Sequence, residues 1–411
     1  MEQTDRQTAY KISVITPVYN AAGCLARAVD SLLGQTIGFE SLEVLLVDDH
    51  STDNSWALIQ AYAAQYPNVV ALQTEENSGS ASVPRNLALA AMHAPCVMFL
   101  DNDDFFEPDA CRALYDEMTA SGADIVTGYY RNADTNGKPL NERGPGALIT
   151  DERKVYRFPE DFGSMHEVRQ IFWCKLYKAE LILTQKLQFK PYSTMEDVLF
   201  LAQYLLACKT MVYRDVLVYN FVESPASLSR SWDERFIGDR GLDYQLLLKI
   251  YTDAGHPECF DAECRNDADF YLSLIFTSPL VQGHGTRLRL LHAWRPLVAA
   301  TLARGLYVAD EEERALFTLL AEGRDDEFCG AYPLYLLRRD KAELTKTQAE
   351  LARVNTAYQE LLAAHHGLDE QYHGLEAQYT QAVANCRALE EKLNKMPGYR
   401  VAKALKHTFK G

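Results

Sequence analysis

The first third of the chain alternates between short apolar runs and segments with helical periodicity. The apolar runs are nearly continuous, which is typical of strands that are buried on both faces of a parallel sheet. Proline, serine, asparagine and aspartate separate the runs, and these residues begin helices or form turns. The pattern therefore predicts an α/β domain with a mostly parallel sheet, with strands at 12–15, 44–47, 69–72, 96–100 and 125–127 and helices at 21–33, from 51–53 to about 66, and at 78–92.

A seven-residue repeat occupies the C-terminal part of the chain. Its first positions fall at Leu337, Leu344, Leu351, Tyr358, His365, Tyr372, Tyr379, Cys386 and Leu393, and a second, mostly apolar set follows three residues after each. One register kept over about eight heptads predicts a coiled coil and hence a homo-oligomer. Gly367 and Gly374 weaken the helix by about 1 kcal/mol each relative to alanine. The alternative is one long helix that packs on its own domain.

The last residues, from Tyr399 to Gly411, contain basic side chains and no acidic ones. On a helix, Val401, Leu405 and Phe409 would share one face and the basic residues the other. Such a segment in an acidic protein is typical of attachment to an anionic membrane surface. A solvated, frayed end is the alternative.

Composition limits the classes of protein that the chain can belong to. Of its 411 residues 47% are hydrophobic, which excludes global disorder, and the net charge of −16 argues against nucleic acid as a partner. Its nine cysteines lack metal-ligand spacing, so we expect reduced thiols. Neither a signal peptide nor an apolar span of about 20 residues is evident. These features predict a cytoplasmic protein, with the basic tail at the inner face of the plasma membrane.

Two of the predicted strands end at aspartates. Asp48 and Asp49 follow Val47, and Asp101, Asp103 and Asp104 follow Leu100. In parallel α/β sheets, ligands bind beyond the carboxyl ends of strands. Asp-x-Asp at such an end can bind a hard cation, Mn²⁺ or Mg²⁺, that keeps open positions for phosphate oxygens. The alternative is a solvated acidic turn that caps the next helix near Pro108.

Several motifs follow one another along the first half of the chain. They are Val14-Ile15-Thr16-Pro17-Val18-Tyr19-Asn20, Gln35-Thr36, Val47-Asp48-Asp49-His50-Ser51-Thr52-Asp53, Asn77-Ser78-Gly79, Arg85-Asn86 and Phe99-Leu100-Asp101-Asn102-Asp103-Asp104. Taken in order, they resemble the family 2 glycosyltransferases over roughly residues 10 to 225. The resemblance implies a GT-A fold and an inverting, metal-dependent transfer from a nucleotide sugar.

The resemblance also implies roles for single residues. Asp49 would accept a hydrogen bond from the base, most often uracil, with Asp48 beside it. The chain departs from the family at His50, where glycine or asparagine is commoner, and we expect the pocket to stay intact. The remaining roles are Thr16, Pro17 and Tyr19 in the base pocket, Arg85 close to the nucleotide, Asp101 near the ribose, Asp103 on the metal and Asp104 as a further metal ligand.

An acidic pair that opens a helix supplies the candidate base. Glu196 and Asp197 resemble the Glu-Asp motif of the family, with Asp197 as the base and Glu196 orienting the acceptor. Acids favoured at a helix N-terminus by its dipole are the alternative. Arg230 lies in a segment that resembles a loop closing over the diphosphate, where it would stabilise leaving-group charge; a plain surface loop is the alternative. The segment Phe172 to Lys178 fits either sugar stacking or a core element.

These observations predict four regions: a GT-A catalytic domain at 1–230, a helical accessory region at 231–336, the coiled coil at 337–396 and the basic tail at 397–411. The predicted function is transfer from a nucleotide sugar, with UDP as the expected nucleotide, to a hydroxyl of a glycan, polymer or lipid-linked acceptor in cell-surface polysaccharide synthesis. A sugar-nucleotide nucleotidyltransferase or an inactive scaffold acting through its coil are the alternatives.

Overall fold

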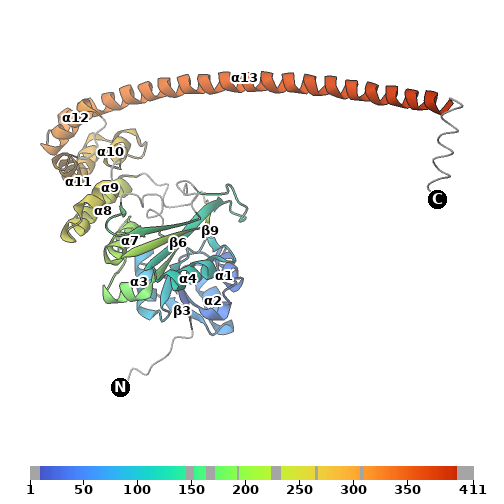
Figure 1. Cartoon of the computed structure of the whole chain (residues 1–411). Coiled ribbons are helices and arrows are strands. Elements are labelled where there is room, and N and C mark those ends of the chain that lie inside the picture. The colour runs from blue at the N-terminus through green and yellow to red at the C-terminus, as the bar shows by residue number, and fades with distance from the viewer. Residues whose placement is uncertain are drawn as a thin grey trace. The chain divides into compact units, whose positions relative to one another are not determined.

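The computed structural model of the chain describes residues 10–144, 152–162, 172–191, 194–223, 233–263, 267–305 and 310–395. The chain divides into two compact units, Met1–Pro333 and Leu334–Gly411. The first unit contains a nine-stranded sheet followed by a group of helices, and the second contains most of one long helix (Figure 1).

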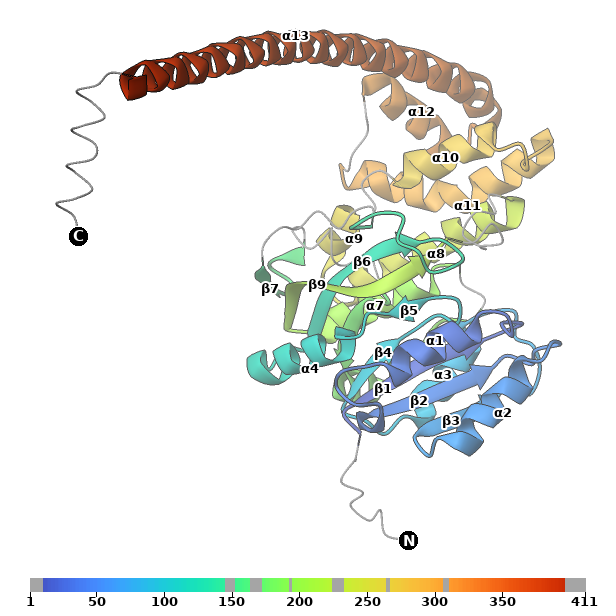
Figure 2. The ribbon, with the colours of Figure 1, turned by 90° about the vertical axis from the view of Figure 1, so that its right-hand side faces the viewer.

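The first half of the sheet is parallel, as the sequence predicts. Its strands lie side by side in the order β3 (Val69–Gln73), β2 (Leu42–Asp48), β1 (Ile12–Val18) and β4 (Cys96–Phe99). Helices α1 (Leu25–Leu33), α2 (Ser55–Gln65) and α3 (Ser82–Ala91) alternate with them along the chain (Figure 2). Since β1 lies between β2 and β4, the aspartates that follow those two strands flank the end of β1.

The second half of the sheet is mixed, so the prediction of a mostly parallel sheet was wrong there. β8 (Lys175–Lys178) is antiparallel to both β4 and β6 (Ile125–Ala133), and β6 is parallel to β9 (Thr210–Val222). The edge strands β5 (Phe105–Phe106) and β7 (Arg153–Arg157) are antiparallel to β9. Short strands with charged residues, such as β7 and β8, lack the buried apolar pattern from which a parallel partner can be predicted.

Apolar side chains cover both faces of the sheet. On one face, a single apolar cluster joins α1, α2 and α4 (Ala110–Ser121) to the sheet, with α4 packed against β6, β8 and β9. On the other face, Phe99 meets a set of aromatic rings, with its centroid 4.4 Å from that of Phe172 and 5.9 Å from that of Phe200 on α7 (Glu196–Ala207). Phe172 is 2% exposed, so its ring belongs to the core and not to a sugar-stacking surface.

The helical region predicted after residue 230 is present and has its own core. It comprises α8 (Glu234–Asp253), α9 (Pro257–Glu263), α10 (Asp267–Thr277), α11 (His284–Ala303) and α12 (Glu311–Ala321). Trp294 is fully buried, donates from Nε1 to the Ile237 carbonyl at 2.9 Å and stacks on Tyr271. A Cβ on Gly241 would lie 3.0 Å from Nε1 of Trp294, so glycine is what lets α8 approach this ring.

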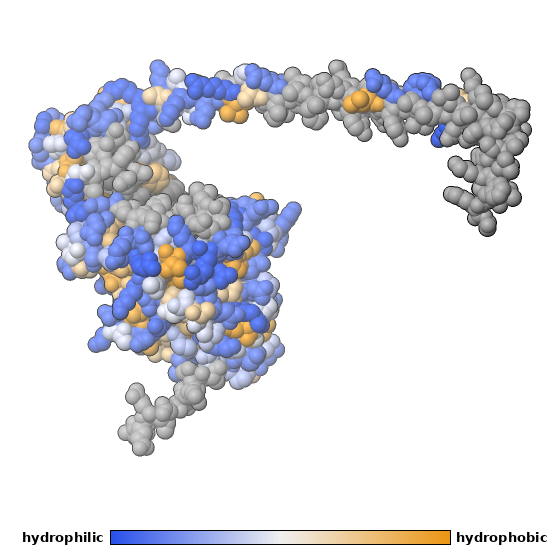
Figure 3. Space-filling model, viewed as in Figure 1, coloured by the Kyte–Doolittle hydropathy of each residue, from blue (hydrophilic) through white to orange (hydrophobic). Residues whose placement is uncertain are grey.

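Helix α13 (Asp325–Lys395) is 71 residues long and contains the seven-residue repeat. Leu337, Val354 and Leu375 are 61–68% exposed, and all three lie at the apolar positions of the repeat. In Figure 3, hydrophobic residues stand beside hydrophilic ones on the coloured part of this helix. The helix is confirmed, whereas the coiled coil and its second copy stay a prediction. The basic tail at 397–411 lies outside the described residues. No helix in the described ranges is long and apolar enough to cross a membrane.

Candidate active site

The turn after β1 is fixed to the loop after β2 by Asn20. Its Oδ1 accepts from the backbone N–H groups of Thr52 at 2.8 Å and Asp53 at 3.3 Å, and its own N–H donates to Ser51 Oγ at 2.9 Å. His50, in the same loop, has φ +59°, a left-handed conformation that glycine and asparagine adopt more readily than other residues. Glycine or asparagine is commoner at this position in the family that the chain resembles. The left-handed backbone explains that preference without any role for the side chain.

Asp48 and Asp49 are both buried at the end of β2. Asp49 accepts hydrogen bonds from Thr74 Oγ1 at 3.0 Å, Ser78 Oγ at 2.9 Å and the Ser78 N–H at 3.1 Å. One oxygen of Asp48 accepts from Ser51 and Gln73, whereas its Oδ1 is buried without a hydrogen-bond partner among the described residues. These hydrogen bonds fix both carboxylates at the end of β2.

The predicted base pocket residues are at the end of β1, next to these aspartates. Thr16 and Pro17 are buried in the strand, and the Thr16 hydroxyl has no hydrogen-bond partner within the described part of the chain. Tyr19 is 47% exposed just beyond the strand, which leaves its ring available to stack on a planar ligand.

The three aspartates after β4 lie in different environments. Asp104 is 1% exposed and accepts from the Tyr219 hydroxyl and the Val222 N–H, both at 2.7 Å, so its carboxylate is tied to β9. Asp101 and Asp103 are partly exposed. Burial raises the pKa of Asp103, and the neighbouring Asp101 raises it further. This repulsion between two carboxylates is what a bound cation would relieve.

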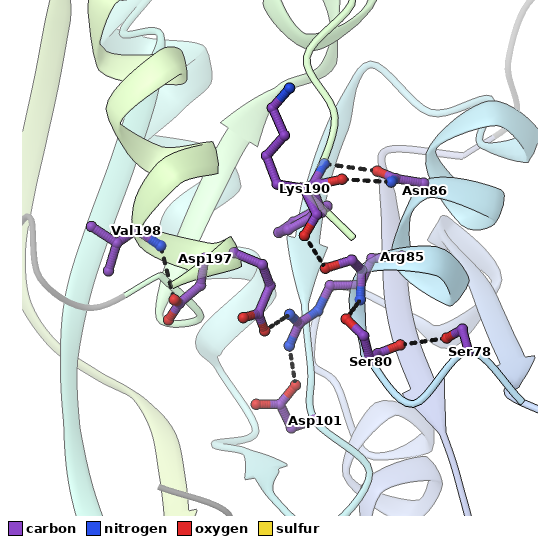
Figure 4. A network of polar contacts seen from close by, with 11 residues as sticks. Ser78, Ser80, Arg85, Asn86, Asp101, Lys190, Asp197 and Val198 are labelled. Atoms are coloured by element: carbon purple, nitrogen blue, oxygen red, sulfur yellow. Dashed lines mark hydrogen bonds and ion pairs between the residues drawn. The ribbon is translucent and has the colours of Figure 1, made fainter. Parts of the chain in front are cut away.

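Arg85 connects this cluster to the start of α7. Its guanidinium lies 2.9 Å from Asp101 Oδ1 and 3.1 Å from Glu196 Oε1, and its side chain is only 6% exposed (Figure 4). The rings of Phe172 and Phe189 lie 5.2 and 5.3 Å from it. Burial acts to lower the pKa of Arg85, but the two carboxylates more than offset this and raise it. Sequence reasoning placed Arg85 near the nucleotide and missed its contact with Glu196.

Glu196 and Asp197 are the first two residues of α7, as the sequence predicts. Burial raises the pKa of Glu196, the nearby Asp197 adds to the rise, and Arg85 opposes it. Asp197 is partly exposed, and its Oδ1 accepts from the Val198 N–H at 2.8 Å (Figure 4). Through Arg85, the structure thus connects the acidic pair at the start of α7 to Asp101 at the end of β4. Arg230 lies outside the described residues.

Three residues that support the site had no role assigned from the sequence. Arg27 on α1 donates to the Asp103 carbonyl at 2.6 Å and so fixes the backbone of the acidic cluster. Asn86 exchanges two hydrogen bonds of 2.8 Å with the backbone of Phe189. Tyr219 holds both the Asp104 carboxylate and the Asp101 N–H. Asn86 stands in a recognisable motif, but no local pattern marks Arg27 or Tyr219.

The site fits a divalent cation that is bound partly by substrate. In the ranges that the structure describes, no group of three or more His, Cys, Asp or Glu side chains is placed to hold a metal ion. Mg²⁺ in phosphate-transfer sites needs only one or two carboxylates, with phosphate oxygens and water as the other ligands. Asp101 and Asp103 provide that number, and the bonds of Asp104 to β9 set it apart from them.

Replacing Arg85 with methionine should destabilise the fold, because it leaves two carboxylates without their counter-charge. Such a loss costs about 3–5 kcal/mol for a fully buried pair, and we expect about 2 kcal/mol here because Asp101 and Glu196 are 30% and 20% exposed. Urea denaturation at pH 7 measures this loss in the free energy of unfolding. The control is Arg289→Met, which removes a 66% exposed arginine paired with Glu234 and should cost less than about 1 kcal/mol. Equal losses in both variants would contradict the burial argument.

Comparison with known proteins relates the first part of the chain to a family. Residues 13–182 match the sequence model of "Glycosyl transferase family 2". The chain is 30% identical over 218 residues to a poly(ribitol-phosphate) beta-glucosyltransferase of Bacillus spizizenii, covering 52% of this chain and 32% of that protein. It is 32% identical over 225 residues to the poly(ribitol-phosphate) beta-N-acetylglucosaminyltransferase TarP of Staphylococcus aureus, covering 53% and 66%. The chain thus spans a third of the length of the first relative and just under two thirds of the second.

A solved structure extends the likeness beyond the matched segment. The crystal structure of Staphylococcus aureus TarS 1–349 in complex with UDP-GlcNAc superimposes with a TM-score of 0.64 at 19% identity, covering 79% of this chain and 91% of that one. At this identity the likeness establishes the fold alone. The chain therefore has a GT-A-like α/β fold with a mixed sheet and a following helical region.

Proposed function

Because this chain belongs to glycosyltransferase family 2, we propose that it transfers a sugar from a UDP-sugar to a hydroxyl of a cell-envelope polymer, with inversion at the anomeric carbon. The names of two relatives describe glucosyl and N-acetylglucosaminyl transfer on poly(ribitol-phosphate). We extend both to this chain: UDP-GlcNAc or UDP-glucose as donor, and a polyol-phosphate polymer of the teichoic acid type as acceptor.

One observation carries the proposal: Arg85 contacts both Asp101, on the proposed donor side, and Glu196, on the proposed acceptor side. Its guanidinium contacts Asp101, at the strand end where ligands bind in such sheets, and Glu196, beside the candidate base. A site in which both sides meet is what transfer between two bound substrates requires, because reaction depends on holding them in contact.

The donor side would bind the nucleotide through residues at the ends of β1, β2 and β4. Tyr19 would stack on the base, and Asp49, held by Thr74 and Ser78, would accept from its N–H group. Asp101 would accept from the ribose hydroxyls. Thr16, Pro17 and Asp48 would line the pocket from the buried ends of β1 and β2.

Asp103, with Asp101, would hold Mn²⁺ or Mg²⁺. A bound cation supplies Lewis-acid stabilisation of the charge that develops on the departing diphosphate. Arg27 keeps the Asp103 backbone in place through its 2.6 Å bond to the carbonyl.

The acceptor side would supply the base. Asp197, partly exposed at the first turn of α7, would take the proton of the acceptor hydroxyl as its oxygen attacks the anomeric carbon and the diphosphate leaves from the opposite face. A single carboxylate suffices for this inverting displacement. Glu196, fixed by Arg85, would orient the acceptor.

A panel of nucleotide sugars tests the proposal. UDP-GlcNAc and UDP-glucose with Mn²⁺ should each be scored for thermal stabilisation and for release of UDP in the presence of a polyol-phosphate polymer. We expect stabilisation by UDP-sugars and not by GDP- or ADP-sugars, and UDP release that depends on the polymer. If no nucleotide sugar stabilised the protein in metal, the proposed function would fail. Pyrophosphate release from UTP and a sugar phosphate would favour the nucleotidyltransferase alternative.

A further inference from the structure

Helix α7 begins with the candidate base, and its N-cap residue is Met195, whose buried side chain makes no capping hydrogen bond. In the first turn, the Val198 N–H donates to Asp197 Oδ1, so the candidate base itself serves one of the N–H groups that a helix start leaves without a backbone acceptor. The position of Glu196 and Asp197 therefore depends on what holds the chain just before them.

Asp243 of α8 holds that segment. It is 7% exposed, and its Oδ2 accepts from both the N–H and the Oγ1 of Thr194, each at 2.9 Å. Thr194 is two residues before Glu196, and α7 and α8 pack together. A carboxylate that accepts two hydrogen bonds from one residue fixes both its backbone and its side chain. A negative charge near the start of α7 also suits the positive end of its dipole.

We infer that Asp243 is a positioning residue through which the helical region sets the geometry of the base Asp197. The effect of Asp243 on catalysis rests on the proposed function. Its hydrogen bonds to Thr194 do not depend on that function. It assigns a role to α8, in which no sequence motif is evident. Asp48, Asp49, Asp101 and Asp103 stand on other elements, and Asp101 keeps its own ion pair with Arg85, so we expect the link to act mainly on the acceptor side.

Amide hydrogen exchange tests the link without any substrate. In Asp243→Ala, the Thr194 amide loses its acceptor, and we expect its exchange and that of residues 195–199 to be about tenfold faster, by local opening of the α7 start. The matched control is Asp239→Asn, which removes a 33% exposed carboxylate paired with Arg235 on the same helix and should leave these amides unchanged. Unchanged exchange in Asp243→Ala would overturn the inference whatever the protein's activity.

Steady-state kinetics test whether Asp243 affects catalysis through Asp197. A displacement of about 1 Å at a reacting group can cost a hundredfold in rate, so we expect kcat of Asp243→Ala to fall about tenfold to a hundredfold. The KM for the UDP-sugar should stay within about twofold, because the donor groups are not displaced. Asp243→Asn, which keeps one acceptor oxygen, should recover part of kcat. Faster exchange with unchanged kcat, or a loss that appears in KM instead, would overturn the positioning role.

A second variant covers the case in which Asp243→Ala does not fold. Thr194→Val removes only the side-chain bond and keeps the backbone bond to Asp243, so it should fold and lose several-fold in kcat. If wild-type protein turned over no nucleotide sugar, the proposed function would fail, while the exchange data would still decide whether Asp243 holds the start of α7.

Discussion

Replacing Asp197 with asparagine should lower kcat by about a thousandfold, within the 10²–10⁴ that general-base catalysis contributes. Asparagine keeps the size of the side chain but cannot take a proton. Binding of the UDP-sugar should be retained, because the donor groups stand on the strand ends and not on α7. Polymer-dependent UDP release gives kcat, and the thermal shift with UDP-sugar gives donor binding.

The same variant distinguishes catalysis from helix stabilisation. If Asp197 served only the helix dipole, its replacement would cost at most about 1 kcal/mol of stability and would leave kcat unchanged. Glu180→Gln is the matched control, because Glu180 is an exposed acid in the first turn of α6 (Ala179–Thr184). It should affect neither kcat nor donor binding. A kcat for Asp197→Asn near that of wild type would contradict its role as the base.

The sequence was sufficient for the parts of the fold that repeat a local pattern. The apolar runs located β1 to β4, and the polar residues that follow β2 and β4 located the aspartates, because a change from apolar to polar residues is expected where a buried strand ends. The start of α7 at Glu196 was predictable for a similar reason: acidic residues are favoured in the first turn of a helix. Local patterns of this kind depend only on neighbours along the chain.

The directions of the later strands and the contacts of the site were not predictable in this way. Arg85 meets Glu196 across 111 residues, and Tyr219 meets Asp104 across 115. Such contacts depend on which strands become neighbours, and β9 reaches the acidic cluster only because it lies between β6 and β5. The same cause separates Asp104 from Asp101 and Asp103: the three are adjacent in sequence, but β9 holds Asp104 by two hydrogen bonds.

Because β9 holds Asp104 apart from Asp101 and Asp103, we expect the metal requirement to depend on Asp103 and not on Asp104. Replacing Asp103 with asparagine should lower kcat/KM by about a hundredfold to a thousandfold, the loss expected when one group that stabilises developing negative charge is removed. Wild-type activity should be lost in EDTA and return with Mn²⁺ or Mg²⁺. The variant should need a higher Mn²⁺ concentration for half-maximal activity, because a neutral amide oxygen binds a hard cation more weakly than a carboxylate.

Asp104→Asn is the contrasting variant, because both carboxylate oxygens of Asp104 accept hydrogen bonds from β9. An asparagine can accept from only one of the two donors, the Tyr219 hydroxyl and the Val222 N–H, so the second is left buried and unpaired. We therefore expect a loss of about 1–3 kcal/mol in the free energy of unfolding, measured in urea. Its Mn²⁺ requirement should stay near that of wild type. A raised Mn²⁺ requirement in Asp104→Asn, with none in Asp103→Asn, would reverse the assignment and make Asp104 the ligand.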